Sequence, residues 1–534
     1  MTSLAATSQV LDASGQPVSG QRITDIRRNA LMASYSQSAF RAASTTDQDM
    51  AGWRPSLASA DADWNLERNT VVARVTDLLR NDPVAVAGRS RRTDMVVGSG
   101  LRLQARVDYA ALGLERDDAK ALNKAIEREW RTFANDPLKR CDVTGRHSVG
   151  EMMRLAEKES YRGEYLMAVR WKPNSGARYA TALQLIDPDR LSNPNYSMDT
   201  PELTAGVERD ADGLPVAYHI QNAHPGDIFG VARGDQWSWT REARLTPWGR
   251  PRIIHGFEAD RVDQTRGVPD LAPVINRLKM LTRYADAEVA SAVVNAMFAA
   301  FIKTGHSPED AASMLMDVDD HKLREQTYEK VKFNGVRLPV LAPGDEIEIP
   351  DASREHGGFT NFMTSFLQSI ASTLDLSYEQ LSMDFSNTNY SSARAALNEV
   401  WRSVDRRRKG FVSQCANWIY MAFLEEALDR YIHVPDGLPG FWDAPAAWMR
   451  CEWIGPGRGF IDPVKEAQGA ELRVNNLTST RTIEAAMQGY DLEELLDMLE
   501  QEKEMMADRD LSAADLGSML AVQAPTDRVQ DQRR

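Results

Sequence analysis

The chain has 534 residues, of which 43% are apolar and 26% are charged. This length predicts two to four structural units, and the composition excludes a wholly disordered chain, a collagen and a disulfide-rich miniprotein. The 63 basic and 77 acidic residues give a formal charge of −14, which argues against a protein that holds nucleic acid through a broad basic surface.

Neither the cysteines nor the apolar runs indicate a secreted or membrane protein. Cys141, Cys415 and Cys451 are far apart and form no C-x-x-C pair, so neither a disulfide framework nor a zinc knuckle is expected. The first residues lack the basic and apolar regions of a signal peptide. The longest apolar run, 289–302, is too short to cross a bilayer. We therefore expect a protein of the reducing cytoplasm with no membrane partner.

The N-terminal part of the chain predicts an arm followed by helices. Residues 1–60 are rich in Ser, Ala, Thr, Gln and Asp and lack sustained periodicity, which is typical of a partly disordered arm. A helix is expected over 61–80, because apolar residues share one face and Asn81-Asp82-Pro83 ends the pattern. Another helix is expected around 117–133. Between about Glu164 and Ile220 the apolar period changes to two, which predicts antiparallel β-structure.

The clearest helix begins near Asp270, which is expected to cap it, with Pro273 in the first turn. If it continues to Ile302, it is about 50 Å long at 1.5 Å per residue, which suggests a strut or a subunit contact. Two ordinary core helices broken near Asp286 are the alternative. Five apolar residues at helical spacing are candidates for the contact with a neighbouring subunit: Leu271, Val274, Ile275, Leu278 and Leu281.

Turns and further helices follow. Alternating apolar residues from Val336 predict a short hairpin within 303–350, and helices are expected over 359–374 and from 393 to about 431. The segment 377–392 between these helices is polar. An acidic helix with a leucine stripe is expected to start near Asp491.

No motif indicates catalysis. The chain lacks a phosphate-binding G-x-x-x-x-G-K-[ST] loop, an H-E-x-x-H zinc motif and a G-x-S-x-G elbow. Val97-Gly98-Ser99-Gly100 lacks the third glycine of a dinucleotide fingerprint and is interpreted as a turn. Asp317, Asp319 and Asp320 are interpreted as a solvated acidic turn rather than a magnesium site. We therefore expect no catalytic residue, no metal and no cofactor.

One cluster of cations stands out, on the helix that follows the polar segment. Cations beside small hydrogen-bonding side chains suit transient contact with a phosphate backbone without base reading. A solvated helix face paired with acidic neighbours on another subunit carries at least equal weight. The candidate DNA-contacting residues are Asn387, Asn389, Tyr390, Arg394, Arg402, Arg406, Arg407, Arg408 and Lys409.

With these residues considered, the chain resembles the portal proteins of lambda-like tailed bacteriophages, the head-to-tail connectors. The resemblance runs from about Asp61 to about Asp508 and consists of short motifs that are weak singly and specific in this order. They are Leu79-Arg80-Asn81-Asp82-Pro83, Val96-Val97-Gly98-Ser99-Gly100, Arg162-Gly163-Glu164, Ile186-Asp187-Pro188-Asp189-Arg190-Leu191, Arg266-Gly267-Val268-Pro269, Tyr378-Glu379-Gln380-Leu381, Asn389-Tyr390-Ser391-Ser392 with Arg394, and Ile461-Asp462-Pro463-Val464-Lys465-Glu466.

The resemblance implies an α+β, mainly helical portal fold assembled as a ring, usually of twelve copies, around a channel for double-stranded DNA. After an N-terminal arm over 1–60, it implies a wing of antiparallel β-structure and helices, two long stem helices, a clip and a helical crown. The implied ranges are 61–265 for the wing, 266–302 for the first stem helix, 303–351 for the clip, 352–376 for the second stem helix, 377–392 for the channel loop, 393–461 for a long helix and the wing return, and 462–534 for the crown and C-terminal tail.

The function implied is that of a passive conduit for packaging and ejection at one capsid vertex of the virion, assembled in the host cytoplasm. The implied partners are the major capsid protein, the large terminase subunit, head-completion or adaptor proteins, and double-stranded DNA bound without sequence preference. Two alternatives remain at this point: a metal-dependent DNA-processing enzyme whose carboxylates converge only in three dimensions, and a non-viral scaffold that forms rings or filaments.

Overall fold

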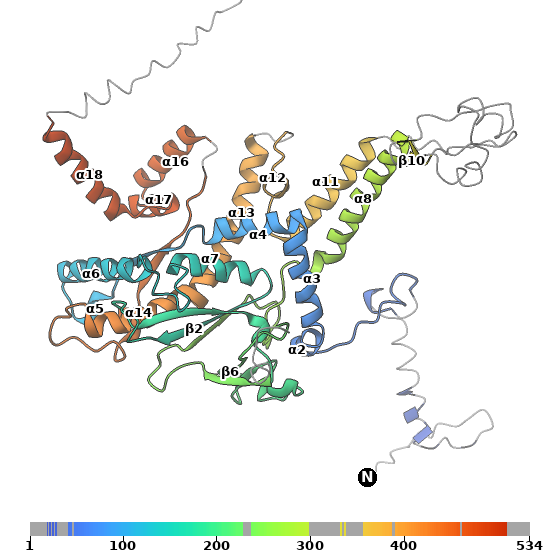
Figure 1. Cartoon of the computed structure of the whole chain (residues 1–534), viewed down its shortest axis with the longest axis horizontal. Coiled ribbons are helices and arrows are strands. Elements are labelled where there is room, and N and C mark those ends of the chain that lie inside the picture. The colour runs from blue at the N-terminus through green and yellow to red at the C-terminus, as the bar shows by residue number, and fades with distance from the viewer. Residues whose placement is uncertain are drawn as a thin grey trace, which may run out of the picture. The chain divides into compact units, whose positions relative to one another are not determined.

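The computed structural model describes residues 41–44, 47–227, 237–297, 332–333, 336–337, 356–386, 390–459 and 462–509, with eight positions between 16 and 28. The chain divides into two compact units, Met1–Asp63 and Trp64–Arg534 (Figure 1). In the first unit a short 3-10 helix spans Arg41–Ala43, and residues 53–59 form neither helix nor strand. Trp53 and Leu57 are 70% and 104% exposed there.

The helix predicted over 61–80 is two helices. α2 (Ala60–Trp64) ends in a turn, and α3 (Arg68–Asn81) follows. The Asn81-Asp82-Pro83 stop signal also starts α4 (Pro83–Val96), which the sequence reasoning missed. The Asp82 carboxylate accepts hydrogen bonds from the backbone N–H groups of Val84 and Ala85, both at 2.9 Å, while proline sits at the first helical position.

The predicted antiparallel β-structure is confirmed and forms two small sheets. The three-stranded sheet has the order β3-β2-β8, built from β2 (Tyr165–Trp171), β3 (Thr181–Ile186) and β8 (Ile253–Gly256). The four-stranded sheet has the order β4-β5-β6-β7. Its strands are Leu203–Thr204, Val207–Arg209, Pro215–Gln221 and Trp239–Ala243. Buried residues of both sheets, among them Leu166 and Ile220, share one apolar cluster.

The largest core lies between helices and the three-stranded sheet. It is formed by α6 (Arg116–Ala134), α7 (Val149–Ser160) and α14 (Asn417–Arg430), with the antiparallel pair β1 (Arg102–Ala105) and β11 (Cys451–Ile454). The helix predicted at 117–133 is therefore confirmed. Two short helices, α5 (Tyr109–Leu112) and α15 (Pro445–Trp448), flank this core. Its centre is aromatic, and the rings of Trp130 and Phe423 meet edge to face at 5.1 Å.

Two long helices extend side by side from the body of the second unit (Figure 1). A 3-10 turn (Ala272–Val274) leads into α8 (Ile275–Met297), and α11 (His356–Thr373) returns. The helix α8 is continuous past Asp286, so the alternative of two broken core helices is wrong. The region between Met297 and Ile302 lies outside the described residues, as does most of 303–351, of which only β9 (Lys332–Phe333) and β10 (Val336–Arg337) are described.

The apolar stripe of α8 is buried by its own chain and not by a neighbouring subunit. Leu271, Val274, Leu278 and Leu281 are 0 to 5% exposed, and they pack with residues of α3, α4 and α11, with Ile275 partly buried at the edge. The inference from this stripe to oligomerisation is therefore corrected. It failed because the sequence does not indicate that α3, α4 and α11 converge on the same face.

The segment 377–392 is not one continuous loop. Residues Tyr378–Ser382 form α12, which buries Leu381. Ser377 and Gln380 form a capping box at its N-terminus. The long helical region predicted from 393 is confirmed as α13 (Tyr390–Phe411), a π-helical turn (Val412–Ala416) and α14.

The fold is therefore α+β and mostly helical, as predicted. None of its described helices is both long and apolar enough to traverse a bilayer.

Three C-terminal helices are weakly covered. They are α16 (Pro463–Asn475), α17 (Arg481–Met487) and α18 (Leu492–Ala507), and none contains a buried residue. The acidic helix predicted from Asp491 is α18, which Asp491 caps. Ion pairs connect its first turns to the neighbouring α6 and β1: Arg131 and Arg102 lie 2.5 and 2.8 Å from Glu494, and Lys124 lies 3.4 Å from Asp497.

We predict that Leu278→Ala lowers the free energy of unfolding by about 2 to 5 kcal/mol, because it leaves a cavity in a fully buried cluster. Met280→Ala is the matched control: Met280 lies on the same helix but is 55% exposed, so a change below about 0.5 kcal/mol is expected. Urea unfolding of the purified chain measures both. Equal effects of the two substitutions would contradict the assignment of Leu278 to the core of one chain.

We also predict a pH dependence at the seam between α6 and α18. Burial raises the pKa of Glu127 to about 7, and the charges of Asp491 and Glu493 act in the same direction, against the hydrogen bond from Ala105 N–H and the charge of Arg131. A raised carboxyl pKa favours the folded state at low pH. This contribution is fully present below about pH 4.5 and is lost as the pH rises to about 7. Glu127→Gln should flatten the thermal-stability profile across that window, and an unchanged profile would contradict the assignment.

Candidate functional site

The predicted cations of α13 divide into an outer set and an inner set. Arg394, Arg402, Arg406 and Lys409 are exposed, and at 100° per residue they fall within an arc of roughly 120°. We call these four residues the outer cation face. Arg402 lies 2.7 Å from Glu399 one turn earlier, and Arg406 pairs with Glu258 and, at 3.2 Å, with Asp375. Exposed pairs of this kind are weak, so these cations stay available to other anions.

Arg407 belongs to the inner set and joins segments distant in sequence. Its side chain is 15% exposed, and its guanidinium lies 3.0 Å from Glu258, 3.3 Å from Asp270 and 3.2 Å from Asp375. Burial alone would raise the pKa of Asp270, but the charges of Arg92 and Arg407 lower it. Asp270 was expected to cap the long helix. Instead its carboxylate binds these two arginines, at the point where the chain enters α8.

Arg408 is also an inner residue, because its guanidinium forms hydrogen bonds with backbone carbonyl oxygens at the end of α4. It donates to the carbonyl oxygens of Val96 at 3.0 Å and Met95 at 2.6 Å, which end that helix, and to that of Pro456 at 3.3 Å. The guanidinium also lies 5.7 Å from the ring centroid of Trp401. Arg407 therefore holds α13 against the residues that flank α8 and α11, and Arg408 holds it against the end of α4.

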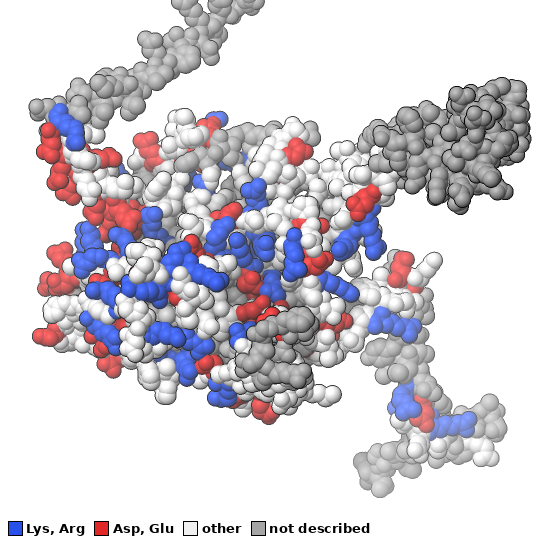
Figure 2. Space-filling model, in the orientation of Figure 1, with Lys and Arg blue, Asp and Glu red and all other residues white. Residues whose placement is uncertain are grey.

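The remaining predicted residues of this cluster are described only in part. Asn387 and Asn389 lie outside the described residues, and only the backbone of Tyr390, the first residue of α13, is described. Figure 2 shows Lys and Arg side chains interspersed with Asp and Glu over the second unit, with no continuous basic surface on that face. This pattern agrees with the net charge of −14.

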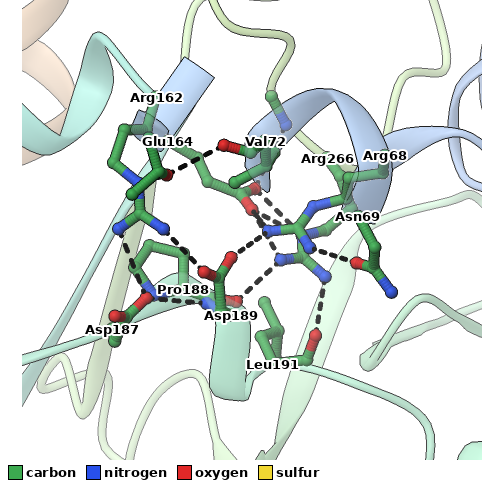
Figure 3. Close-up of polar contacts among 12 residues, drawn as sticks. Arg68, Asn69, Val72, Arg162, Glu164, Asp187, Pro188, Asp189, Leu191 and Arg266 are labelled. Atoms are coloured by element: carbon green, nitrogen blue, oxygen red, sulfur yellow. Dashed lines mark hydrogen bonds and ion pairs between the residues drawn. The ribbon is translucent and has the colours of Figure 1, made fainter. Parts of the chain in front are cut away.

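A buried carboxylate organises the base of the long helices (Figure 3). Glu164 is 2% exposed, at the start of β2, and both of its oxygens accept from the guanidinium of Arg266 at 2.5 to 3.0 Å. Arg68 of α3 lies 2.8 Å from Oε1, and His255 Nε2 of β8 lies 2.9 Å from Oε2. We call these four residues the Glu164 hub. Burial raises the pKa of Glu164, but Arg266 and Arg68 overcome this effect and hold it well below its ordinary value.

Two glycines allow the backbones to meet at the Glu164 hub. A Cβ on Gly267 would lie 2.0 Å from the carbonyl oxygen of Gly163, and Gly163 itself adopts a φ of 119°. Arg266 also donates to the carbonyl oxygens of Pro188, at 2.9 Å, and Leu191, at 2.8 Å. The fold therefore unites three separate sequence motifs that begin at Arg162, Ile186 and Arg266. Sequence reasoning missed Arg68, His255 and Arg92, for which no local signal exists.

One group of potential metal ligands occurs within the part of the chain that the structure describes. Asp187, Asp189 and His224 have ligand atoms within 4.8 Å of one another. Arg162 lies 3.5 Å from Asp187 and 2.6 Å from Asp189, so a guanidinium already balances both carboxylates. The acidic residues Asp317, Asp319 and Asp320 lie outside the described residues.

Comparison with known proteins identifies the family. Residues 46–408 match the family described as "Phage portal protein, lambda family". The chain belongs to the lambda family of phage portal proteins. It is 32% identical over 460 residues to the portal protein of Escherichia phage N15, covering 83% of this chain and 86% of that one. It is also 32% identical over 461 residues to portal protein B of Escherichia phage lambda, covering 83% and 85%.

Two more distant likenesses were found. The probable portal protein of Halomonas phage phiHAP-1 is 25% identical over 424 residues, covering 78% of this chain and 76% of that one. A chain from the neck of a native GTA particle, computed with C12 symmetry, matches at 13% identity with a TM-score of 0.40, covering 80% of this chain and 99% of that chain. The portal family is structural and non-enzymatic, so the hypothesis of a metal-dependent DNA-processing enzyme is wrong.

We predict that the two sets of cations on α13 differ in their effect on stability. Arg407→Glu places a fourth carboxylate among Glu258, Asp270 and Asp375 and should lower the free energy of unfolding by about 3 to 5 kcal/mol. Arg402→Glu, at a side chain that is 77% exposed, should change it by less than about 1 kcal/mol. Denaturant titration of the two variants measures the difference. Comparable values would contradict the division into outer and inner cations.

Proposed function

We propose that twelve copies of this chain close into a ring at one vertex of the capsid and form the channel for packaging and ejection of double-stranded DNA. The ring is assembled in the host cytoplasm and becomes part of the virion. Family membership supports the portal role, and the uncovered C-terminal helices are the structural observation that supports the ring. On this proposal, α8 and α11 are the stem, 303–351 is the clip, and α16 to α18 belong to the crown.

The uncovered helices call for a neighbouring copy. Leu496, Leu499 and Met505 of α18 are 49 to 54% exposed, and on α16 and the turn after it Leu472 and Leu477 are 60% and 91% exposed. Helices that bury no residue gain little stability from their own chain, because most helical stability in proteins comes from packing of an apolar face. A closed ring supplies every copy with the same neighbour on each side and leaves no open end.

The charge of the ring suits the passage of DNA without retention. Twelve copies at −14 each carry a formal charge of about −168. A predominantly acidic wall repels a polyanion, and the outer cation face supplies local contacts whose strength falls with salt. Contacts of this kind involve phosphates and carry no sequence information. We therefore infer weak, salt-sensitive and sequence-independent contact between α13 and the duplex.

We assign different partners to the clip and to the wing, which lie at opposite ends of the proposed stem. The clip would receive the large terminase subunit during packaging and the head-completion or adaptor proteins afterwards, while the wing would contact the major capsid protein. The Glu164 hub and Asp270 stand where the wing meets the first stem helix, so these buried ion pairs would fix the orientation of the stem relative to the capsid shell.

Native mass and negative-stain imaging of the purified chain test the ring, and DNA binding then tests the outer cation face. Twelve copies of the 59.6 kDa chain give about 715 kDa and an image with a central hole.

The double variant Arg402→Glu with Lys409→Glu should keep that mass but bind duplex DNA more weakly at low salt, with a shallower dependence of affinity on salt.

The matched control reverses two exposed cations of α6, Lys120→Glu with Arg128→Glu, and so makes the same change in net charge away from α13. Its DNA affinity and salt dependence should stay close to those of the unsubstituted ring. Equal losses in both double variants would show that only net charge matters and would remove the DNA role from α13. Compact monomers under all assembly conditions would overturn the ring itself.

A further inference from the structure

A pocket lies between the end of α13 and the segment that leads from β8 to α8. Its volume is about 410 Å³, which is within the range of small-molecule sites. Residues of α7, β2, α13 and the segment after β8 line it. The walls combine carboxylates with aromatic rings, among them those of Phe257 and Phe411. Carboxylates beside aromatic rings are the chemistry that recognises organic cations.

Acidic groups outnumber basic groups in this pocket. The guanidinium of Arg407 lies 3.0 Å from Glu258 and 3.3 Å from Asp270. The buried Arg92 lies 3.3 Å from Glu157. Three of the four lining carboxylates therefore have a partner already. The charged residues of the lining are Glu157, Glu258, Asp260, Asp270, Arg406 and Arg407.

The fourth carboxylate, that of Asp260, has no such partner. It is exposed and forms no ion pair with any residue that the structure describes. Partial burial raises the pKa of Asp260, and the charges of Asp270 and Glu258 act in the same direction, against that of Arg407. Asp260 therefore lies in a negative potential that its neighbours do not offset, and a cation is the ligand that would offset it.

A second and independent feature points to a ligand on the inner side of the pocket. Tyr165, at the start of β2, lines the pocket at 2% exposure, and its hydroxyl has no nitrogen or oxygen partner among the described residues. The hydroxyl lies beside the thiol of Cys415, which is only a weak hydrogen-bonding group. A buried hydroxyl without a strong partner is costly, so a donor that reaches it gains a hydrogen bond.

The cation that fits is organic and not a metal ion. Among the described residues, only Asp187, Asp189 and His224 bring three potential ligand atoms within 4.8 Å of one another, so the carboxylates of this pocket are too widely spaced to share one ion. An alkylammonium group has three N–H donors and no acceptor, which matches carboxylate and hydroxyl oxygens. Its hydrocarbon chain matches the aromatic walls.

We propose that this pocket binds a small aliphatic diamine. One ammonium group pairs with the carboxylate of Asp260 on the exposed side, and the hydrocarbon chain lies against Phe257 and Phe411. The second nitrogen donates to the hydroxyl of Tyr165 on the buried side, where the carboxylate of Glu157 is near. The inference concerns a single copy of the chain and does not rest on the proposed ring. The ligand would link the segment before α8 to β2 and α13.

Isothermal titration calorimetry of the purified full chain at low salt tests the site. The diamine putrescine should bind saturably, because both of its nitrogens find an acceptor. Butylamine, which has one nitrogen, should bind more weakly, and butanol, which has no charge, should not bind. Magnesium chloride at equal ionic strength should not displace putrescine, since the pocket holds no set of converging metal ligands.

Two pairs of variants locate the binding. Asp260→Asn should lower the affinity for putrescine about tenfold, because a charge-assisted hydrogen bond is lost. Asp263→Asn is its matched control: the same charge is removed at an exposed position outside the pocket, where asparagine tolerates the φ of 62°. The control should bind as the unsubstituted chain does.

Tyr165→Phe removes only the buried hydroxyl. It should lower the affinity for putrescine about threefold or more and leave that for butylamine nearly unchanged, because only the diamine reaches the inner side. Tyr420→Phe is the matched control, since the hydroxyl of Tyr420 is also buried without a hydrogen-bond partner but lies outside the pocket. Affinity for either amine should not change in that variant.

The outcomes decide for or against the diamine. Absence of saturable putrescine binding overturns the proposal, as do equal losses in Asp260→Asn and Asp263→Asn, which would show that only net charge matters. Displacement by magnesium would show diffuse attraction of cations. Tighter binding of Nα-acetyl-lysine amide than of putrescine would assign the pocket to a lysine side chain of another protein, against a free diamine. None of these results depends on whether rings form.

Discussion

The base of the structure depends on one buried carboxylate, Glu164. Removing a carboxylate from water is costly, and the interior offers it three hydrogen-bonding partners, Arg266, Arg68 and His255. Each partner comes from a different segment: the approach to α8, α3, and β8. Removing Glu164 would leave Arg266, whose side chain is 1% exposed, with its charge uncompensated. The contact therefore ties the approach to α8 to the three-stranded sheet, and the glycines at 163 and 267 allow the backbones to come close enough to make it.

A second set of ion pairs, around Asp270, fixes the position of α13. Arg92 and Arg407 reach this carboxylate from α4 and α13, just before α8 starts. Together with the Glu164 hub, these pairs fix the entry of α8 on both sides, while Leu278 and its neighbours fill the space between with apolar contacts. The ion pairs specify the direction in which α8 leaves, and apolar packing supplies most of the free energy of folding. Within the outer cation face, Arg406 shares Glu258 and Asp375 with Arg407, whereas the ion pair of Arg402 is with Glu399 of the same helix.

The sequence predicted elements better than it predicted their partners. Periodicity found α6, α8, α14 and α18, because each carries an apolar stripe over several turns. It missed α4, because Asn81-Asp82-Pro83 ends one helix and begins another with the same residues. It could not separate Arg407 from Arg402, since the carboxylates that bind Arg407 lie 32 to 149 residues away. The motif at Arg162 was noticed through resemblance alone. Its physical role depends on Arg266, about a hundred residues later, which no local pattern indicates.

For the proposed ring, the distribution of exposed apolar side chains indicates where neighbouring copies should meet. The apolar stripe at the start of α8 is buried within one chain, so this part of the structure needs no neighbour to bury it. Trp53 and Leu57 in the first unit, and the leucines and methionines of α16 to α18, have no comparable cover. Subunit contacts that involve such peripheral elements can form after each chain has folded. In the proposed ring, assembly would then be separable from folding, because the buried cluster at the start of α8 does not have to open for neighbouring copies to meet.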